Sequence, residues 1–145
     1  MQNATPDLVD VRGPRFAAWV TSAVLAVVLL TGNVALLAVQ ALVFAAGALL
    51  GMRRHPYGVL FRALVAPRLG PVREREPEPP LRFAQSVGLV FAVAGVVGYL
   101  LGAPLVGAVA TGLALAAALL NAAVGFCLGC ELYLIVSRVL PAHTA

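Results

Sequence analysis

Charge is scarce in this chain, and its absence from two long stretches indicates the class of protein. Charged residues make up 11% of the 145 positions, whereas hydrophobic residues make up 61%. No charged residue occurs from Phe16 to Met52 or from Phe83 to Cys130. A soluble domain with this composition would expose large apolar patches, so we expect lipid to surround most of its surface. The sequence therefore predicts an integral membrane protein with the lipid bilayer as its main partner.

Long polar segments are also missing. The longest, Arg53 to Arg82, is too short to build a hydrophobic core, which excludes a soluble catalytic domain. The lack of ionisable side chains inside the apolar tracts argues against an ion or proton pump, because such routes use buried ionisable groups. The first tract runs into a second apolar stretch and a basic stop, unlike a signal peptide, so we expect the N-terminus to be retained.

Each apolar tract is long enough for two membrane-spanning helices. About 20 apolar residues cross roughly 30 Å of hydrocarbon, and Gly32-Asn33 and Gly102-Ala103-Pro104 suit chain reversals within the two tracts. We therefore expect residues 1–145 to form a single all-α membrane domain, with four transmembrane helices arranged as two helical hairpins. The expected spans are residues 14–31, 34–52, 81–101 and 104–126.

The distribution of arginine predicts the orientation. All ten basic residues lie in the N-terminal tail, the central segment or the C-terminal tail, and none lies in the two short turns. The positive-inside rule places both termini and the loop 53–80 in the cytoplasm, with the protein in the inner (plasma) membrane. The net charge of +4 follows from this topology, so we do not expect nucleic-acid binding.

Short helices are expected on the cytoplasmic surface. The first half of the loop 53–80 is typical of an interfacial helix, and its proline-rich second half of an extended linker. An unbroken helix from Pro104 to Leu140 would be about 55 Å long. We therefore expect it to bend at Gly125 and Gly129 and to continue as an interfacial helix over about residues 131–140.

The two halves share a sequence pattern. Residues 15–20 (RFAAWV) and 82–87 (RFAQSV) match at four of six positions, and each opens a hairpin, so the halves could pack as a parallel internal repeat. Small residues at helix-packing spacing predict close helix contacts in the bundle or in a homo-oligomer. They are Gly47 and Gly51, then Ala84, Gly88 and Ala92, and finally Ala108, Gly112 and Ala116.

Cysteine is nearly absent, and both copies fall in one C-x-x-C motif, Cys127 and Cys130. Three apart on a helix, they share one face, and about 35 Å along the helix from Pro104 they would reach the cytoplasmic edge. That compartment is reducing, which disfavours a permanent disulfide and favours a reactive thiol pair. Because the motif lies near a helix end, the dipole of a helix start would not activate it. The alternative is a pair of small buried hydrophobic side chains.

Four residues could support the thiols. Glu131 lies four residues after Cys127 and could act on thiol protons, or simply reside at headgroup level. Arg12, Arg15 and Arg82 are placed to meet the cysteine region from the cytoplasmic side, although topology alone would explain them. Asn121, about two turns deeper, is expected to hydrogen-bond a neighbouring helix.

Metal-ligating residues are too few for a site within one chain. Beyond the two thiols there are only His55 and His143, at no useful spacing, whereas a zinc or iron site takes four ligands. We expect no cofactor, and a metal bound by Cys127 and Cys130 is conceivable only across an oligomer interface.

Several segments together resemble the bacterial membrane family known only as domain of unknown function 4395. The resemblance covers nearly the whole chain, and the composition, rich in alanine and arginine and without lysine, is typical of a high-GC actinobacterium. The most specific element is F-C-x-G-C, here Phe126, Cys127, Gly129 and Cys130. The resemblance implies no established activity, but it implies a thioredoxin-like or sulfurtransferase protein as partner. The other matching segments are residues 11–16, 55–57 and 80–84.

The function expected from these observations is a membrane thiol–disulfide or sulfur-relay protein. One cysteine of Cys127 and Cys130 would attack a disulfide or persulfide, and the other would resolve the intermediate. Which one attacks is not readable from the sequence. The alternative is a non-enzymatic scaffold or transporter subunit in which the motif packs helices or binds metal in a dimer.

Overall fold

The computed structural model describes residues 8–140, and most of them are helical. Three of the long helices are apolar and long enough to cross a membrane, whereas α2, with 17 residues, is a shorter apolar helix. The expectation of a mostly helical chain with membrane-type helices is confirmed. The four long helices are α1 (Arg12–Thr31), α2 (Val34–Leu50), α4 (Glu78–Leu100) and α5 (Pro104–Val124).

Glycine ends the first helix of each pair. Gly32 adopts φ 66° and donates its N–H to the Val28 carbonyl at 2.7 Å, and Asn33 then caps α2 by accepting the N–H of Leu36. Gly102, with φ 75°, reverses the chain between α4 and α5. Positive φ is accessible to glycine at little cost, so both turns form where the sequence predicts them.

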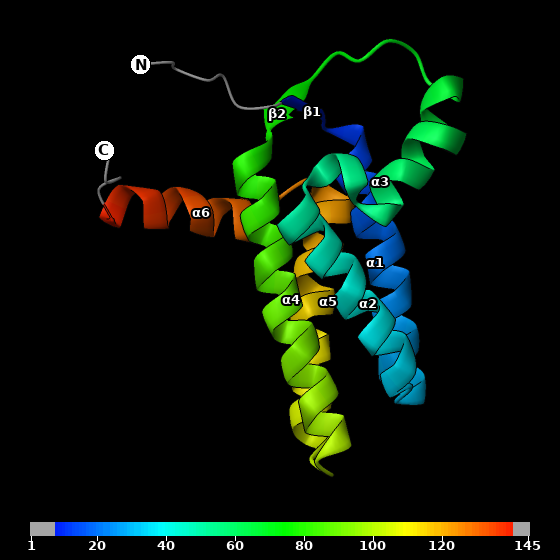
Figure 1. Cartoon of the computed structure of the whole chain (residues 1–145), viewed down its shortest axis with the longest axis vertical. Coiled ribbons are helices and arrows are strands. Elements are labelled where there is room, and N and C mark those ends of the chain that lie inside the picture. Colours follow the sequence, from blue (N-terminus) through cyan, green and yellow to red (C-terminus); the bar gives the residue numbers. More distant parts are fainter. Residues whose placement is uncertain (1–7, 141–145) are drawn as a thin grey trace.

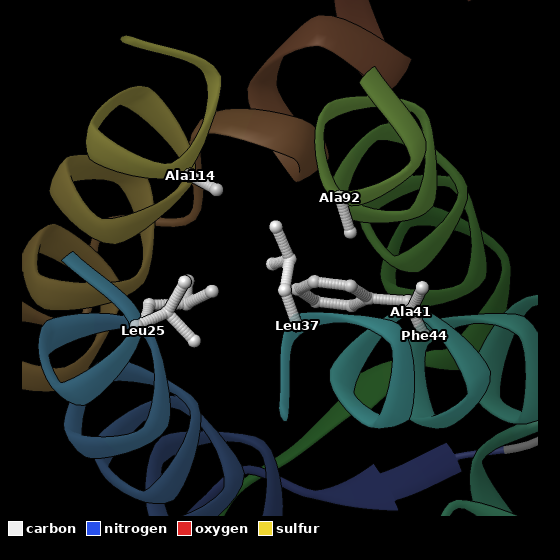
Figure 2. Close-up of a cluster of buried hydrophobic side chains, with 7 residues drawn as sticks. Leu25, Leu37, Ala41, Phe44, Ala92 and Ala114 are labelled. Atoms are coloured by element: carbon white, nitrogen blue, oxygen red, sulfur yellow. The ribbon is translucent and has the colours of Figure 1, made fainter. Parts of the chain in front are cut away.

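The four long helices pack around one apolar core. α2 packs chiefly on α4, and α1 packs chiefly on α5, while α4 also lies along α5. Figure 2 shows side chains from all four helices pointing into the core. The ring of Phe44 fits against Gly88, where an added Cβ would stand 2.6 Å from a ring carbon. The buried core residues are Leu25, Val28, Leu37, Ala41, Phe44, Ala92 and Ala114.

The small-residue faces divide into two groups. Gly47 and Gly88 face side chains of other elements so closely that an added Cβ would clash, and Ala84 contacts Gly129 in the same way. These positions serve close packing, as predicted. Gly112 instead has nothing within 4 Å of an added Cβ, and Ala116 is exposed. The third face is therefore open in a single copy of the chain.

The remaining elements gather at one end of the bundle, opposite the two hairpin turns (Figure 1). They are β1 (Leu8–Asp10), α3 (Pro56–Leu60) with the helical turns that extend it to Arg68, β2 (Arg75–Pro77) and α6 (Leu128–Val139). A short 3₁₀ turn, Met52–Arg54, joins α2 to α3. In the figure, α6 runs across the direction of the long helices.

Two short strands depart from the all-α expectation. β1 pairs with β2 in antiparallel register, with Val9 opposite Glu76, and the Val11 N–H donates to the Glu74 carbonyl at 3.3 Å. The sequence predicts an extended linker for this part of the loop. It is extended, but the pairing ties the start of α1 to the start of α4.

Candidate functional site

The two cysteines lie in a break between helices, not on one continuous helix. α5 ends at Val124, and Gly125 takes φ 74° and donates its N–H to the Asn121 carbonyl at 2.9 Å. The bend expected at Gly125 is therefore a complete helix end. Cys127 and Cys130, with Cα atoms 5.2 Å apart, form a disulfide, and both are partly exposed. The structure thus shows the pair in its oxidised form, which the predicted reactive thiol pair also adopts.

The motif opens α6, which corrects the expectation that it lies near a helix end. Cys127 is the N-cap residue, and its Sγ accepts the backbone N–H of Cys130 at 3.2 Å. Cys130 lies in the first turn. A helix start presents free N–H groups and the positive end of the helix dipole, so this position favours negative charge on sulfur.

Gly129 does not bend the helix as expected but brings it against α4. A Cβ added at Gly129 would stand 2.5 Å from both the Cα and the Cβ of Ala84. One turn further along α6, the rings of Phe83 and Tyr133 pack with centroids 5.8 Å apart. These two contacts hold the first turn of α6, and therefore the disulfide, in place beside α4.

Of the arginines predicted to meet the cysteine region, Arg15 lies close to it. Its guanidinium donates to the Ala122 carbonyl in the last turn of α5 at 3.1 Å, and its Cζ lies 4.0 Å from a Cβ added at Gly125. The positive charge at this helix end interacts favourably with the carbonyl groups that lack a partner there. Arg15 thus positions the end of α5 from which the C-x-x-C loop departs.

Arg12 and Arg82 are engaged elsewhere. Arg12 pairs with Asp10 at 2.8 Å and donates to the Gly70 carbonyl. The hydrogen bonds from Arg12 lower the pKa of Asp10 below its ordinary value. Arg82 donates to the carbonyls of Ala48 and Leu49 and so caps the end of α2. Two arginines therefore make corresponding contacts. Arg15 of α1 donates to the last turn of α5, and Arg82 of α4 donates to the last turn of α2.

Glu131 lies in the first turn of α6, where a negative charge complements the helix dipole. Its backbone N–H donates to the Cys127 carbonyl at 3.0 Å. Its side chain is exposed and makes no hydrogen bond with any residue from 8 to 140. The structure places it beside the disulfide in the chain but gives it no contact with sulfur.

An apolar cavity of about 340 Å³ extends from the bundle interior to the underside of α6. Leu128, Gly129 and Leu132 line it from α6, and Phe44 and Phe91 from α2 and α4. Asn121 also lines it and makes no side-chain hydrogen bond among the described residues, in contrast to the packing role expected for its amide. The cavity therefore adjoins the residues that carry the disulfide.

A buried polar cluster was not predicted. His55, 1% exposed, accepts the Tyr57 N–H at Nδ1 and hydrogen-bonds Gln85 through Nε2 at 3.0 Å. The Tyr57 hydroxyl donates to Gln40, whose Nε2 is buried without a partner in the described part of the chain. An added Cβ at Gly47 would clash with His55 and Gln85. Single polar residues far apart in an apolar sequence gave no signal of this convergence.

Burial decides the protonation of this cluster. Desolvation lowers the pKa of His55, and the hydrogen bond to Gln85 opposes that shift only in part. Burial also raises the pKa of the Tyr57 hydroxyl. His55 is therefore neutral at pH 7, with its proton on Nε2, since Nδ1 accepts a hydrogen bond.

No group of three or more His, Cys, Asp or Glu side chains forms a metal-binding arrangement within residues 8–140. His55 is engaged with Gln85 and Tyr57, and His143 lies outside the described residues. The structure thus does not bring His55 to the two cysteines. A larger cavity of about 590 Å³ adjoins β1, and Arg53, Arg62 and Arg75 are among the residues that line it.

Comparison with known proteins identifies a family but no activity. Residues 9–138 match the model of a family described as a domain of unknown function, DUF4395. No curated protein and no solved structure matches the chain.

Proposed function

We propose that this chain, which belongs to the family described as domain of unknown function DUF4395, is a membrane thiol–disulfide or sulfur-relay protein. The observation that carries the proposal is the position of the disulfide. Cys127 and Cys130 open a helix at the end of the bundle that also carries the polar elements, and both are partly exposed. A protein partner or a small sulfur compound can reach them there.

Cys127 is the attacking sulfur in this proposal. When the pair is reduced, the Cys130 N–H and the start of α6 stabilise a thiolate at Cys127. This thiolate attacks one sulfur of a substrate disulfide, forms a mixed disulfide and releases the other sulfur as a thiolate. Cys130, deprotonated, then attacks the Cys127 sulfur, so that the intramolecular disulfide forms and the substrate leaves fully reduced. A persulfide donor would enter by the same attack on its outer sulfur.

We infer four spans with both termini in the cytoplasm of an actinobacterial-type bacterium. α2, at about 1.5 Å per residue, is about 26 Å long, close to the roughly 30 Å of hydrocarbon. All arginines lie at the end of the bundle away from the two uncharged turns, which favours that end as the cytoplasmic one in the inner membrane. The exposed apolar side chains of α6, such as Ile135 and Val139, support an interfacial position.

The pairing of the helices supports a parallel repeat. α1 contacts α5 as α4 contacts α2, and Arg15 and Arg82 make corresponding capping contacts. The open small-residue face around Gly112 supports self-association, which is also what the alternative function, a scaffold with a metal shared by two copies, requires. For the redox function, the partner is a cytoplasmic thioredoxin-like or sulfurtransferase protein.

Thiol labelling tests this function. The purified full-length protein is reduced, treated with diamide and then labelled with a maleimide, in parallel with the Cys127→Ser and Cys130→Ser variants. We expect diamide to abolish labelling of the wild type, because a disulfide forms within the chain, and reduction to restore the labelling. Each single variant should stay labelled or become cross-linked to a second chain. Thiols that remain fully labelled after diamide in the wild type would contradict the proposal. Metal analysis of the same reduced sample tests the scaffold alternative.

A further inference from the structure

The cavity beneath α6 has the composition of a site for a neutral, mostly apolar ligand. None of its lining side chains is charged, and most are aliphatic or aromatic. Its volume of about 340 Å³ falls at the small end of the range of ligand pockets, about 300–1,000 Å³. A ligand of one ring with short substituents fits this space, and a longer apolar tail could extend between helices into lipid.

Three polar side chains line this apolar space, and each has a hydrogen-bonding group without a partner among the described residues. The Thr21 hydroxyl and the Asn121 amide make no side-chain hydrogen bond there, although Thr21 is only 5% exposed. Gln85 accepts a hydrogen bond from His55 through Oε1, which leaves its Nε2 group as a free donor. Polar groups placed in this way in an apolar pocket orient a ligand that carries hydrogen-bond acceptors. The donors suit ring carbonyl oxygens.

We propose that this cavity binds the ring of a membrane quinone, which exchanges two electrons with Cys127 and Cys130. The inference rests on the proposed thiol–disulfide function. Neither cysteine lines the cavity, but Leu128 and Gly129, which lie between them in the chain, form part of its wall. A ring bound at this end of the cavity is therefore adjacent to the segment that carries the sulfurs. A quinone is a lipid-soluble carrier of two electrons and two protons, which is the amount that a dithiol releases when it forms a disulfide.

The reaction balances without a further reagent. The Cys127 thiolate attacks the quinone ring, and Cys130 then attacks Cys127, so that the S–S bond forms and the sulfur–ring bond breaks. The two sulfurs lose two electrons and the two thiols lose two protons. The quinone takes up both and leaves as the quinol. Reduction of the new disulfide by a cytoplasmic dithiol protein completes the cycle.

Binding is tested separately from thiol chemistry. Ubiquinone-1 is a suitable probe because its ring is fully substituted and does not add thiols permanently. The Cys127→Ser/Cys130→Ser double variant in lipid nanodiscs is equilibrated with radiolabelled ubiquinone-1, and bound ligand is measured against empty nanodiscs. We expect saturable binding with one site per chain. Binding that rises linearly with concentration, as in empty nanodiscs, would overturn the proposal.

A matched pair of substitutions on α5 tests where the ligand binds. Ala118 lines the cavity, whereas Ala116 is exposed on the same helix and does not line it. We expect Ala118→Phe to weaken ubiquinone-1 binding about tenfold or more, and Ala116→Phe to leave it unchanged. Equal effects of the two variants would contradict the assigned site. Asn121→Leu, which removes a donor with little change in volume, is expected to weaken binding less than Ala118→Phe.

Electron transfer is then followed in the wild type. The reduced protein is mixed with ubiquinone-1, and quinone loss at its ultraviolet absorption band is compared with thiol loss. We expect one quinol per disulfide formed, a rate slowed about tenfold by Ala118→Phe, and unchanged oxidation of that variant by diamide. If diamide oxidises the pair reversibly but ubiquinone-1 does not, the quinone proposal fails alone. If the pair does not cycle with diamide either, the thiol function itself fails.

Discussion

Gly129 in α6 contacts Ala84 in α4 so closely that a Cβ on Gly129 would stand 2.5 Å from the Ala84 Cα. The added Cβ is fixed to the backbone of α6, and the Ala84 Cα belongs to the backbone of α4. The clash can therefore be relieved only if one of the two helices moves. The position of the disulfide therefore depends on a glycine that lies between the two cysteines. Gly129 is thus part of the C-x-x-C motif and also the residue that allows α6 to pack against α4.

Gly129→Ala is expected to displace α6 and to lower the free energy of unfolding by about 1–3 kcal/mol, the usual cost of overpacking a close contact. Helix loss on heating in detergent, followed by circular dichroism, measures the change. Gly112→Ala is the matched control, since nothing lies within 4 Å of its added Cβ. Alanine has the higher helix propensity, so this control should be neutral or stabilise by up to about 1 kcal/mol. The reverse order of the two variants would refute the contact.

The roles of the two sulfurs differ. With Cys130→Ser, Cys127 keeps its place at the N-cap of α6, so its thiolate is stabilised by the helix start. We expect this variant to react with oxidised glutathione about tenfold faster than Cys127→Ser, a difference of about 1.4 kcal/mol in activation free energy. Mass spectrometry of the glutathione adduct over time gives both rates. Faster reaction at Cys130 would reverse the assignment of the attacking sulfur.

Arg82 stabilises the contact between the two halves of the bundle. Arg82→Met removes its hydrogen bonds to the Ala48 and Leu49 carbonyls but keeps an apolar side chain of similar length. Because the guanidinium is partly exposed, we expect a loss of only about 1 kcal/mol of stability. Arg68→Met is the control, since Arg68 is exposed and its side chain makes no hydrogen bond within residues 8–140. Equal melting temperatures for the two variants would exclude the capping role.

His55 predicts a specific dependence of stability on pH. In the unfolded chain its pKa is near 6.5, whereas burial lowers the pKa in the folded protein, so the unfolded state binds the proton first as pH falls. Stability is therefore fully present above pH 6.5 and falls below it, towards the folded-state pKa. The slope reaches at most about 1.4 kcal/mol per pH unit for one proton.

The comparison of wild type with His55→Gln between pH 7.5 and 5 isolates this group. Glutamine can still donate to Gln85 but does not titrate, so we expect the variant to lose most of the slope in melting temperature over this range. The pKa of Asp10 is lowered by Arg12, so Asp10 titrates below this range. Burial raises the pKa of Glu76, and its contribution to the slope is common to both proteins. An unchanged slope in the variant would show that the buried neutral histidine is not the cause.

Much of the fold could be predicted from local pattern. The two uncharged tracts and the glycines between their halves predict long helices. Helices occupy both tracts, and α1 ends at Thr31, directly before the turn residue Gly32. Their ends differ from the expected spans by a few residues. In α4, for example, Pro79 and Pro80 are tolerated in the first turn, so the helix begins before the apolar run.

The candidate site was only partly predictable. The sequence singled out Cys127 and Cys130, since both cysteines share one motif, and it placed a bend at Gly125. It could not show that the chain ends one helix there and starts another, because both a bent helix and a break satisfy the same apolar pattern. The contact of Gly129 with Ala84 and the hydrogen bond of Arg15 with Ala122 select the break, and both join residues far apart in the chain.

The amino-acid sequence alone determined which parts of this protein are apolar, how long they are and where charge is allowed, because these are properties of single residues and their local periodicity. The tertiary structure alone decided which polar atoms meet. His55 finds Gln85 thirty residues away, and Arg82 finds Ala48 thirty-four residues away. Such pairs depend on how helices pack side by side, and in an apolar environment each buried polar group must find its partner through that packing.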